Sequence, residues 1–316
     1  MIIAIDHGNF AIKTIHDTFT SGINVHTLKP PLTTDTIEYG KSIWTLSGER
    51  ISYMRDKTKD ERFFVLSLFA IARELIKSDK YQPNIPIDLS VGLPPEHYSV
   101  LKDKIIKYFR RPENIEFVYN NKPFNIIMQN VLVYPQGYAA IVPRAHTLFD
   151  IPMMYIIDIG GYTTDVLLLR HGTPDLKVCR SLEMGTITLN NDVISKVSAL
   201  HDILVEDSHI SSVLQGHKTV LPPAVKDTID AATKSHTDNI LNKLRELQVD
   251  LRSSPAIFIG GGACMFKPFI EKSDMVVKAD YILDTKANAI GYHMLASAQL
   301  KPLPEQNSNG GANIEG

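Results

Sequence analysis

Cysteine is scarce in this sequence, which has only Cys179 and Cys264 among its 316 residues. The two residues form neither a Cys-x-x-Cys motif nor a disulfide framework, so a thiol-redox motif and a disulfide-rich secreted fold are excluded. We expect both to be reduced core residues of a cytosolic protein. The 11 histidines lack metal-ligand spacing, which indicates surface or core positions rather than a zinc site.

Long apolar runs and an excess of positive charge are also missing. No apolar run approaches about 18 residues, so no membrane-spanning helix is predicted. The sequence begins directly with a strand pattern and shows no signal peptide, which predicts a cytoplasmic protein. The 33 Lys and Arg residues are balanced by 35 Asp and Glu residues, giving a net charge of −2. Direct binding to nucleic acid is therefore not expected, and any action on DNA would require an adaptor.

Two short segments share one design, in which an apolar run is followed by an Asp, by one or two glycines and by small polar residues. They are residues 5–9 (IDHGN) and 157–165 (IDIGGYTTD). Each predicts a β-hairpin whose glycine turn exposes backbone N–H groups that bind phosphate oxygens. A third segment, residues 257–263 (IFIGGGA), indicates a strand that runs into a glycine turn. Together they predict two related half-domains that close on one nucleotide.

The polar residues of these segments suggest a magnesium–phosphate site. Asp6 and Asp158 end their strands, where a carboxylate can hold Mg²⁺ directly or through its waters. Lys13 lies on the returning strand and would supply a point charge for a phosphate if it reaches the cleft. The hydroxyl groups of Thr163 and Thr164 add donors. Each piece alone is common in turns and on solvated strands, so the prediction depends on their order and spacing.

The rest of the chain alternates strand and helix patterns, and its length allows two domains. Strands are predicted over residues 1–6, 11–16, 43–46, 87–92, 115–119, 124–128, 131–134, 153–158, 164–170, 175–182 and 255–259. Helices are predicted over 60–78, with Asp60 as N-cap, over 94–108, from 138, and over 186–200, 205–214, 224–251 and 286–299. Residues 50–60 are highly charged and predict a loop. Hairpins that alternate with helices in two similar halves imply α/β architecture with mixed sheets.

Five motifs, taken in this order, resemble those of the actin/Hsp70/sugar-kinase superfamily. The two phosphate loops are residues 6–13 and 158–165, the adenosine motif is 259–263, and the connecting motifs are 134–140 (YPQGYAA) and 288–292 (NAIGY). The resemblance covers residues 1 to about 298 and implies an actin-like fold, with two related α/β domains flanking a nucleotide cleft. It implies a domain I of residues 1–148 and 289–303 and a domain II of residues 149–288. Residues 304–316 are expected to form a disordered tail.

Within the superfamily the chain most resembles the bacterial plasmid-segregation actins of the ParM/StbA type. The compact length, the Asp-to-Lys spacing of the first loop and the Gly-Gly-x-Thr-x-Asp character of the second carry this resemblance. The chain departs from it at Gln136, where ParM-type proteins often place a Glu, and at Tyr162, which is inserted in the second loop. A glutamine can orient an attacking water although it cannot act as a full general base.

The resemblance implies that ATP or GTP binds in the cleft with hydrated Mg²⁺ held by Asp6 and Asp158. The catalytic set would be Gln136, Asp158 and Asp6. Phosphate and nucleoside contacts are expected from Gly8, Asn9, Lys13, Gly160, Gly161, Thr163, Thr164, Glu183, Gly185, Asn190, Gly260, Gly261, Gly262 and Met265. Of these, Glu183, Gly185 and Asn190 are candidates for the ribose or base.

The function implied is a filament-forming nucleoside triphosphatase. Closed protomers would stack head to tail, and a contact of this kind that does not close into a ring generates a filament. A ParR-like DNA-binding adaptor on plasmid centromere DNA would capture the filament, with no direct contact to nucleic acid or membrane. Two other functions remain open on the same fold: a small-molecule kinase, and a non-polymerising regulatory ATPase or scaffold.

Overall fold

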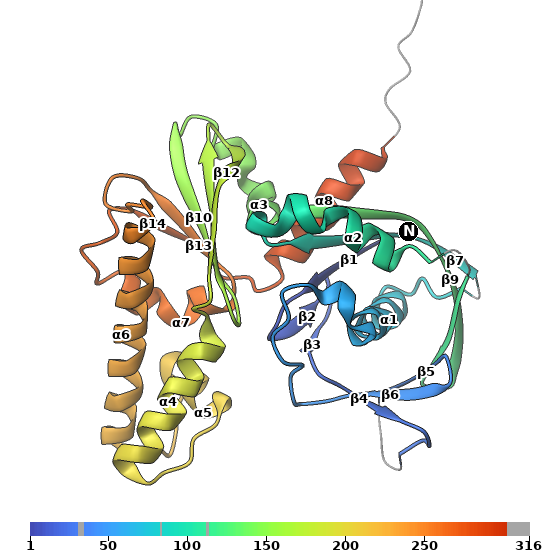
Figure 1. Ribbon diagram of the computed structural model, residues 1–316, viewed down its shortest axis with the longest axis horizontal. Coiled ribbons are helices and arrows are strands. Elements are labelled where there is room, and N and C mark those ends of the chain that lie inside the picture. Colours follow the sequence, from blue (N-terminus) through green and yellow to red (C-terminus); the bar gives the residue numbers. More distant parts are fainter. Residues whose placement is uncertain (31–34, 83, 112–113, 302–316) are drawn as a thin grey trace, which may run out of the picture.

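Two lobes lie side by side in the computed structural model, which describes residues 1–30, 35–82, 84–111 and 114–301 (Figure 1). Lobe I is a nine-stranded sheet with its packed helices, and lobe II is a five-stranded sheet with its own helices. The predicted α/β class with mixed sheets is confirmed. The predicted tail, residues 304–316, lies outside the described residues, and the predicted domain boundaries stay predictions. No helix within the described ranges is long and apolar enough to cross a membrane.

Lobe I contains most of the short strands. Its strands are β1 (Ile2–His7), β2 (Ala11–Lys13), β3 (Thr18–Thr20), β4 (Ile23–His26), β5 (Thr36–Tyr39), β6 (Ser42–Leu46), β7 (Asn84–Leu93), β8 (Ile115–Tyr119) and β9 (Lys122–Pro135). Its helices are α1 (Glu61–Lys77) and α2 (Tyr98–Phe109), preceded by the 3₁₀ turns η1 (Lys57–Lys59) and η2 (Pro95–His97).

Lobe II carries the longest helix of the described residues. Its strands are β10 (Met153–Ile159), β11 (Thr164–Arg170), β12 (Thr173–Leu182), β13 (Ala256–Ile259) and β14 (Ala279–Ile282). Its helices are α4 (Thr186–His201), α5 (Asp207–Leu214), α6 (Pro223–Glu246) and α7 (Gly261–Ile270). The short α3 (Tyr138–Ile141), the 3₁₀ helix η3 (Val142–Thr147) and α8 (Ala287–Leu300) lie where the chain passes between the lobes.

The two lobes repeat one strand topology. Five neighbouring strands of lobe I run in the order β3-β2-β1-β7-β9, and lobe II has the order β12-β11-β10-β13-β14. In each set of five, the three strands that come first in sequence (β1–β3 in lobe I, β10–β12 in lobe II) form an antiparallel meander. The other two (β7 and β9, or β13 and β14) pair in parallel. The prediction of two related halves is confirmed. β1 and β10 therefore occupy equivalent central positions, and both are buried almost throughout because neighbours cover both faces.

Helix α1 begins where the sequence predicts it. The Asp60 carboxylate accepts a hydrogen bond from the backbone nitrogen of Arg62 at 3.0 Å, which confirms the predicted N-cap. One buried face was expected, but most of the helix is buried because the sheet of lobe I curves around it (Figure 1). Its aromatic and aliphatic side chains, such as Phe64 and Leu68, form the centre of the lobe I core.

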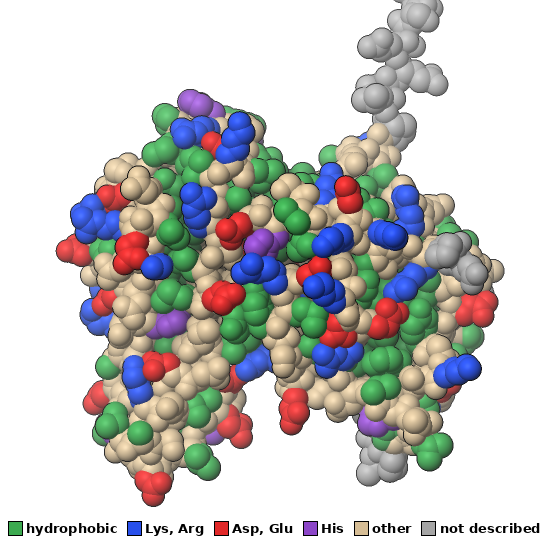
Figure 2. Space-filling model, viewed as in Figure 1, with side chains coloured by type: hydrophobic (Ala, Val, Ile, Leu, Met, Phe, Trp, Pro, Cys, Tyr) green, Lys and Arg blue, Asp and Glu red, His purple; other side chains and the backbone are tan. Residues whose placement is uncertain are grey.

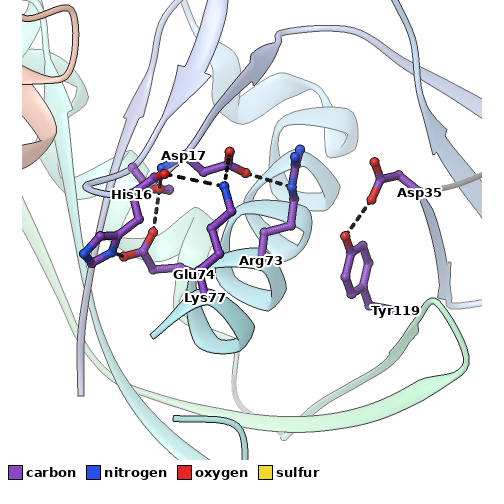
Figure 3. Close-up of polar contacts among 8 residues, drawn as sticks. His16, Asp17, Asp35, Arg73, Glu74, Lys77 and Tyr119 are labelled. Carbon is purple, nitrogen blue, oxygen red and sulfur yellow. Dashed lines mark hydrogen bonds and ion pairs between the residues drawn. The ribbon is translucent and has the colours of Figure 1, made fainter. Parts of the chain in front are cut away.

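The C-terminal half of α1 is tied to the turn after β2 by buried polar contacts (Figure 3). Arg73 Nε lies 2.7 Å from one carboxylate oxygen of Asp17, and Lys77 Nζ donates to the other at 2.6 Å. Glu74, between them in sequence, accepts a hydrogen bond from Thr14 Oγ1 at 2.6 Å. These contacts hold the end of β2 against the helix, and with it the predicted phosphate-binding lysine of that strand.

Several predicted elements differ from the structure, among them the strand predicted over 11–16, of which only Ala11–Lys13 forms β2. The strands predicted over 124–128 and 131–134 form one strand, β9, because a register shift against β7 absorbs the irregular residue between them. Helix α6 ends several residues before the predicted end because Gln248 adopts a φ of +67°. The glycine run predicted as a turn begins a helix, α7. Strands β3, β4, β5 and β14 have only three or four residues, too few for an alternating pattern to identify them.

The connecting motifs cross each other at α3 and α8. An ideal Cβ on Gly291 of α8 would lie 1.8 Å from the backbone oxygen of Ala139 in α3, so only glycine allows the two helices to approach this closely. Ser90 Oγ of β7 donates to the backbone oxygen of Tyr292 at 2.9 Å, which fixes α8 on the lobe I sheet. The two chain crossings between the lobes therefore form one packed unit beside the ends of β1 and β10.

Candidate functional site

A cavity of about 380 Å³ lies between the lobes, and the surface is hollowed between them in Figure 2. Three structural elements that line it are the turn after β1, the turn after β10 and the N-terminus of α7. Both turns belong to equivalent hairpins of the duplicated topology. The three segments that the sequence singles out thus meet at one site.

The lobe I side of the site is built around Asp6. The β1–β2 register places Lys13 opposite it, and Lys13 Nζ donates to Asp6 Oδ2 at 3.2 Å. Gln136 Nε2, from the first connection, donates to Asp6 Oδ1 at 3.2 Å. Burial pulls the pKa of Lys13 down, but the carboxylates of Asp6 and Asp158 outweigh it and raise the pKa. The lysine therefore stays charged.

The lobe II side repeats this arrangement around Asp158. Asn288 Nδ2, from the second connection, donates to Asp158 Oδ2 at 3.0 Å, and Asn288 Oδ1 accepts from the backbone nitrogen of Gly137 at 2.9 Å. Burial raises the pKa of Asp158 to about 6, the bond from Asn288 opposes the rise, and repulsion from Asp6 adds to it. Each lobe thus presents one buried strand-end carboxylate that is held by an amide of a connecting segment.

A third carboxylate, Asp165, faces the same cavity. It lies directly opposite Asp158 in the β10–β11 register, and its Oδ2 accepts a hydrogen bond from Thr163 Oγ1 at 3.1 Å. Burial raises its pKa to about 7, and repulsion from Asp158 adds to the rise. Like charges placed opposite each other in a sheet are destabilising, so this arrangement costs stability in the free protein.

We expect Asp165→Asn to stabilise the ligand-free protein at alkaline pH. A carboxyl whose pKa is raised by folding gives most stability at low pH, and this stability is lost as pH rises through the folded-state pKa. The rise to about 7 corresponds to about 4 kcal/mol of unfolding free energy at pH 8, and to almost none at about pH 4. Urea unfolding at both values measures this. Asp192→Asn, at a half-exposed position of α4, is the control. An Asp165→Asn variant no more stable than wild type at pH 8 would contradict the assignment.

The two hairpin turns touch each other across the cavity. A Cβ on Gly161 of the second turn would lie 2.9 Å from Cβ of Phe10 in the first turn, and within the first turn a Cβ on Gly8 would lie 2.7 Å from the backbone oxygen of Ala11. Glycine is therefore required for the turns to come this close. The backbone nitrogen of Gly160 donates to the oxygen of Thr163 at 2.8 Å, which closes the second turn. The gap between the turns is suited to phosphate groups rather than to bulky side chains.

The third side of the cavity is the N-terminus of α7. Gly260, with a φ of +87°, precedes the helix, and a Cβ there would lie 2.5 Å from Asp158 Oδ1. A Cβ on Gly261 would meet nothing within 4 Å, although the residue lines the cavity, so open space lies beside this backbone. Asn190 lines the same cavity, and its side-chain oxygen is buried without a hydrogen-bond partner among the described residues. This free acceptor and the open backbone fit a hydroxyl-bearing nucleoside.

Most of the predicted residues meet at the cavity. Those that line it are Asp6, Gly8, Asn9, Lys13, Gln136, Asp158, Gly160, Gly161, Thr163, Asn190, Gly260, Gly261 and Met265. Their roles as ligands of a nucleotide or of Mg²⁺ stay predictions. In the part of the chain that the structure describes, no three carboxylate, imidazole or thiol groups gather closely enough to hold a metal.

Four predicted residues do not line the cavity. Thr164 Oγ1 donates to the backbone oxygen of Met184 at 2.6 Å, and Gly262 packs against Ile159. Gly185 precedes α4, and a Cβ there would lie 2.6 Å from the backbone oxygen of Gly161. The Glu183 carboxylate lies 3.6 Å from the guanidinium of Arg55, a residue of lobe I. The structure therefore gives these four residues packing or pairing contacts instead.

Several cavity residues were not predicted. Asp165 and Asn288 belong to the quoted motifs, but neither was assigned a role. His7 follows Asp6, and burial together with Lys57 lowers its pKa to about 3, so this imidazole is neutral. Lys57 comes from the charged segment predicted as a loop, and no periodic pattern marks it. Only the two motif residues carried a signal in the sequence.

Sequence profiles of two families match the chain. Residues 11–138 match the family "Actin like proteins N terminal domain", and residues 156–272 match "Archaeal actin homologue MreB-like, C-terminal". These matches cover most of both lobes, although β1, the strand that carries Asp6, precedes the first matched residue. A search of curated proteins found no match.

Solved structures with the same fold cover nearly the whole chain. The archaeal actin homologue Ta0583, in its complex with ADP, matches with a TM-score of 0.75 at 17% identity, over 94% of this chain and 99% of its own. ParM in a 15-stranded filament from Clostridium botulinum matches with a TM-score of 0.71 at 19% identity, over 94% and 99%. ParM from Bacillus thuringiensis with ATP matches with a TM-score of 0.67 at 13% identity, over 95% and 99%. At these identities the likeness shows the fold.

Proposed function

This chain belongs to the actin-like superfamily, and from that premise we propose that it is a polymerising nucleoside triphosphatase. The observation that carries the proposal is the pair of strand-end carboxylates, Asp6 and Asp158, that face one cavity from two duplicated lobes. Each is fixed by an amide, from Gln136 and Asn288, on the segments that join the lobes. A ligand at this site would contact both lobes and would therefore stabilise their closed arrangement.

The residues of the cavity fit a Mg²⁺-nucleotide, ATP or GTP. Mg²⁺ usually binds one or two carboxylates and keeps several waters, and it would neutralise phosphate charge when bound. Asp6 and Asp158 are placed to hold it, and Lys13 supplies a fixed positive charge beside them. Gln136, whose amide already donates to Asp6, is placed to orient a water near the phosphates. The neighbours solved with ADP and with ATP support a nucleotide at this site.

Assembly into a filament is the second part of the proposal. A protomer that stacks head to tail on a copy of itself forms an open, non-closing array. Support comes from structural neighbours that were solved as filaments, ParM of Clostridium botulinum and Alp12. We further propose segregation of plasmid DNA through a ParR-like adaptor in the cytoplasm. Its support is the likeness to ParM and the net charge of −2, which disfavours direct DNA binding.

High-speed pelleting with light scattering tests the proposal. Purified protein is incubated with Mg²⁺ and ATP, GTP, ADP or no nucleotide, and phosphate release is followed in parallel. We expect pelleting that requires a triphosphate and reverses as phosphate is released. Tight nucleotide binding without assembly over a wide range of protein and salt concentration would contradict the filament. Turnover only with a small-molecule acceptor would indicate a kinase, and binding without turnover would indicate a scaffold.

A further inference from the structure

Lys57 is a cavity residue that the predicted nucleotide contacts leave unexplained. It lies on η1, lines the cavity, and its ammonium donates a hydrogen bond to the backbone oxygen of His7. Among the residues that the structure describes, no carboxylate lies within ion-pair distance of this ammonium, whereas Lys13 is 3.2 Å from Asp6. A desolvated cation without a counter-ion opposes folding. The ammonium also lies 5.2 Å from the centroid of the Phe63 ring, a cation–π contact that compensates this cost only in part, so the remaining charge points to an anionic ligand.

The surroundings of Lys57 favour an anionic ligand. Loss of water lowers its pKa to about 8, repulsion from Lys13 adds to this, and the carboxylates of Asp6 and Asp165 oppose it. A phosphate placed between the two lysines would relieve their repulsion and favour the charged form of Lys57. Ammonium groups bind phosphate as compact point charges, and Lys57 has hydrogen-bond donors left for this purpose.

The segment that carries Lys57 also reaches lobe II. This segment, residues 50–57, is called the strap here. The ring of Tyr53 stacks on Tyr162 of the second phosphate turn, with centroids 3.9 Å apart and planes at 10°. Two ion pairs flank this stack, between Arg50 and Asp207 of α5 and between Arg55 and Glu183 after β12. The strap thus joins lobe I to lobe II at three points beside the cavity.

We propose that Lys57 binds the terminal phosphate of a nucleoside triphosphate, and that the lobe II contacts of the strap position it there. The inference rests on the proposed nucleotide site. The nucleoside end of the cavity is marked by Gly260 and Gly261 of α7 and by Asn190. Lys57 contacts the β1 end instead, at His7, which places it at the opposite end of the phosphate chain. Because the strap contacts lobe II, closing of the two lobes and binding of the third phosphate by Lys57 would occur together.

Binding of paired nucleotides to Lys57→Gln tests the inference. Isothermal titration is run with a slowly hydrolysed triphosphate analogue and with the diphosphate, each with Mg²⁺. We expect the variant to lose about tenfold or more in triphosphate affinity and less than about threefold in diphosphate affinity. Lys59→Gln, exposed on the same 3₁₀ turn, is the matched control and should bind both nucleotides like wild type. Equal losses for both nucleotides, or no loss, would overturn the proposal.

Two further measurements, of triphosphate binding by wild type and of the melting temperature of the variant, distinguish a wrong role for Lys57 from a wrong nucleotide site and from a folding defect. If wild type binds no triphosphate, the proposed function is wrong. If wild type binds triphosphate and Lys57→Gln binds it with equal affinity, only the role of Lys57 is wrong. The nucleotide-free melting temperature of Lys57→Gln should equal or exceed that of wild type, because the substitution removes a desolvated charge. A lower melting temperature would show that Lys57 stabilises the fold and would contradict the argument from its missing counter-ion.

A double-mutant cycle tests the strap itself. Tyr53→Ala removes the stack on Tyr162 without touching the ammonium. We expect it to weaken triphosphate binding in the wild-type background and to add little in the Lys57→Gln background, because a positioning residue acts through the residue that it positions. Additive losses in the two backgrounds would show that Tyr53 acts independently of Lys57.

Discussion

Asp158→Asn is expected to abolish nucleotide-dependent assembly while leaving the protein folded. The substitution keeps the size of the side chain, and its amide oxygen can still accept the hydrogen bond from Asn288 Nδ2. It removes the negative charge that is placed to hold hydrated Mg²⁺ from lobe II. Hydrogen bonds to charged groups contribute about 1.5–3 kcal/mol, so affinity for the Mg²⁺-triphosphate should fall about tenfold to a hundredfold. Pelleting and titration under wild-type conditions measure both effects.

The same variant should be more stable than wild type without ligand. Because folding raises the pKa of Asp158 to about 6, wild type loses stability as pH rises through that value, and the neutral variant does not. Circular dichroism melts at about pH 8 should therefore show a higher midpoint for the variant. Asp192→Asn, at a half-exposed position of α4 away from the cavity, is the control for both measurements. Assembly by Asp158→Asn at the wild-type concentration and rate would contradict the Mg²⁺ role.

The sequence predicts those parts of the site that are determined by a hairpin register or that belong to a recognisable motif. Asp6 and Lys13 are separated by a short glycine turn, so hairpin register alone brings them opposite each other. The connecting motifs were identified by their resemblance to those of the superfamily, and Gly291 of the second motif proves to be a point of close approach between α8 and α3. The hairpin depends only on neighbouring residues, whereas the helix crossing joins residues far apart in sequence and was found through the motif.

The positions of the remaining site residues depend on which face of a strand each side chain occupies and on packing between segments that are far apart in sequence. Side chains alternate along β11, so Asp165 faces the cavity while Thr164 bonds to Met184 on the other side. With Tyr162 inserted in the turn before β11, sequence spacing could not fix which of the two faces inward. Glu183, a candidate for the ribose or base, pairs with Arg55, which is far away in sequence. Such contacts follow from tertiary structure and leave no local pattern.

The amide–carboxylate pairs explain why the connecting segments belong to the site. Gln136 contacts Asp6 of lobe I, and Asn288 contacts Asp158 of lobe II while also accepting from the backbone of Gly137. A rotation of one lobe against the other would change the orientation of both amides relative to the carboxylates that they contact. The geometry of the carboxylates is therefore coupled to the packing of α3 on α8. This coupling makes the helix crossing the most sensitive structural position outside the cavity.

Gly291→Val is accordingly expected to cause the largest loss of stability among the substitutions considered. Even a single Cβ at this position would lie 1.8 Å from the backbone oxygen of Ala139 and 2.3 Å from its carbonyl carbon, and backbone cannot rotate away as a side chain can. Overpacking of a well-packed contact costs about 1–3 kcal/mol or more, and valine adds two further methyl groups. We expect about 3 kcal/mol or more, measured by urea unfolding.

Gly291→Val should also abolish nucleotide binding, because it disrupts the packing of α8 on α3. A shift of α8 moves Asn288, which lies three residues before Gly291 and holds both Asp158 and the N-terminal end of α3. Gly48→Ala is the matched control, because a Cβ at Gly48 meets nothing within 4 Å, and it should alter neither stability nor binding. Gly291→Ala tests the same contact with the smallest possible side chain. If Gly291→Ala unfolds at the wild-type urea concentration and binds nucleotide with wild-type affinity, the helix crossing does not set the position of the carboxylates.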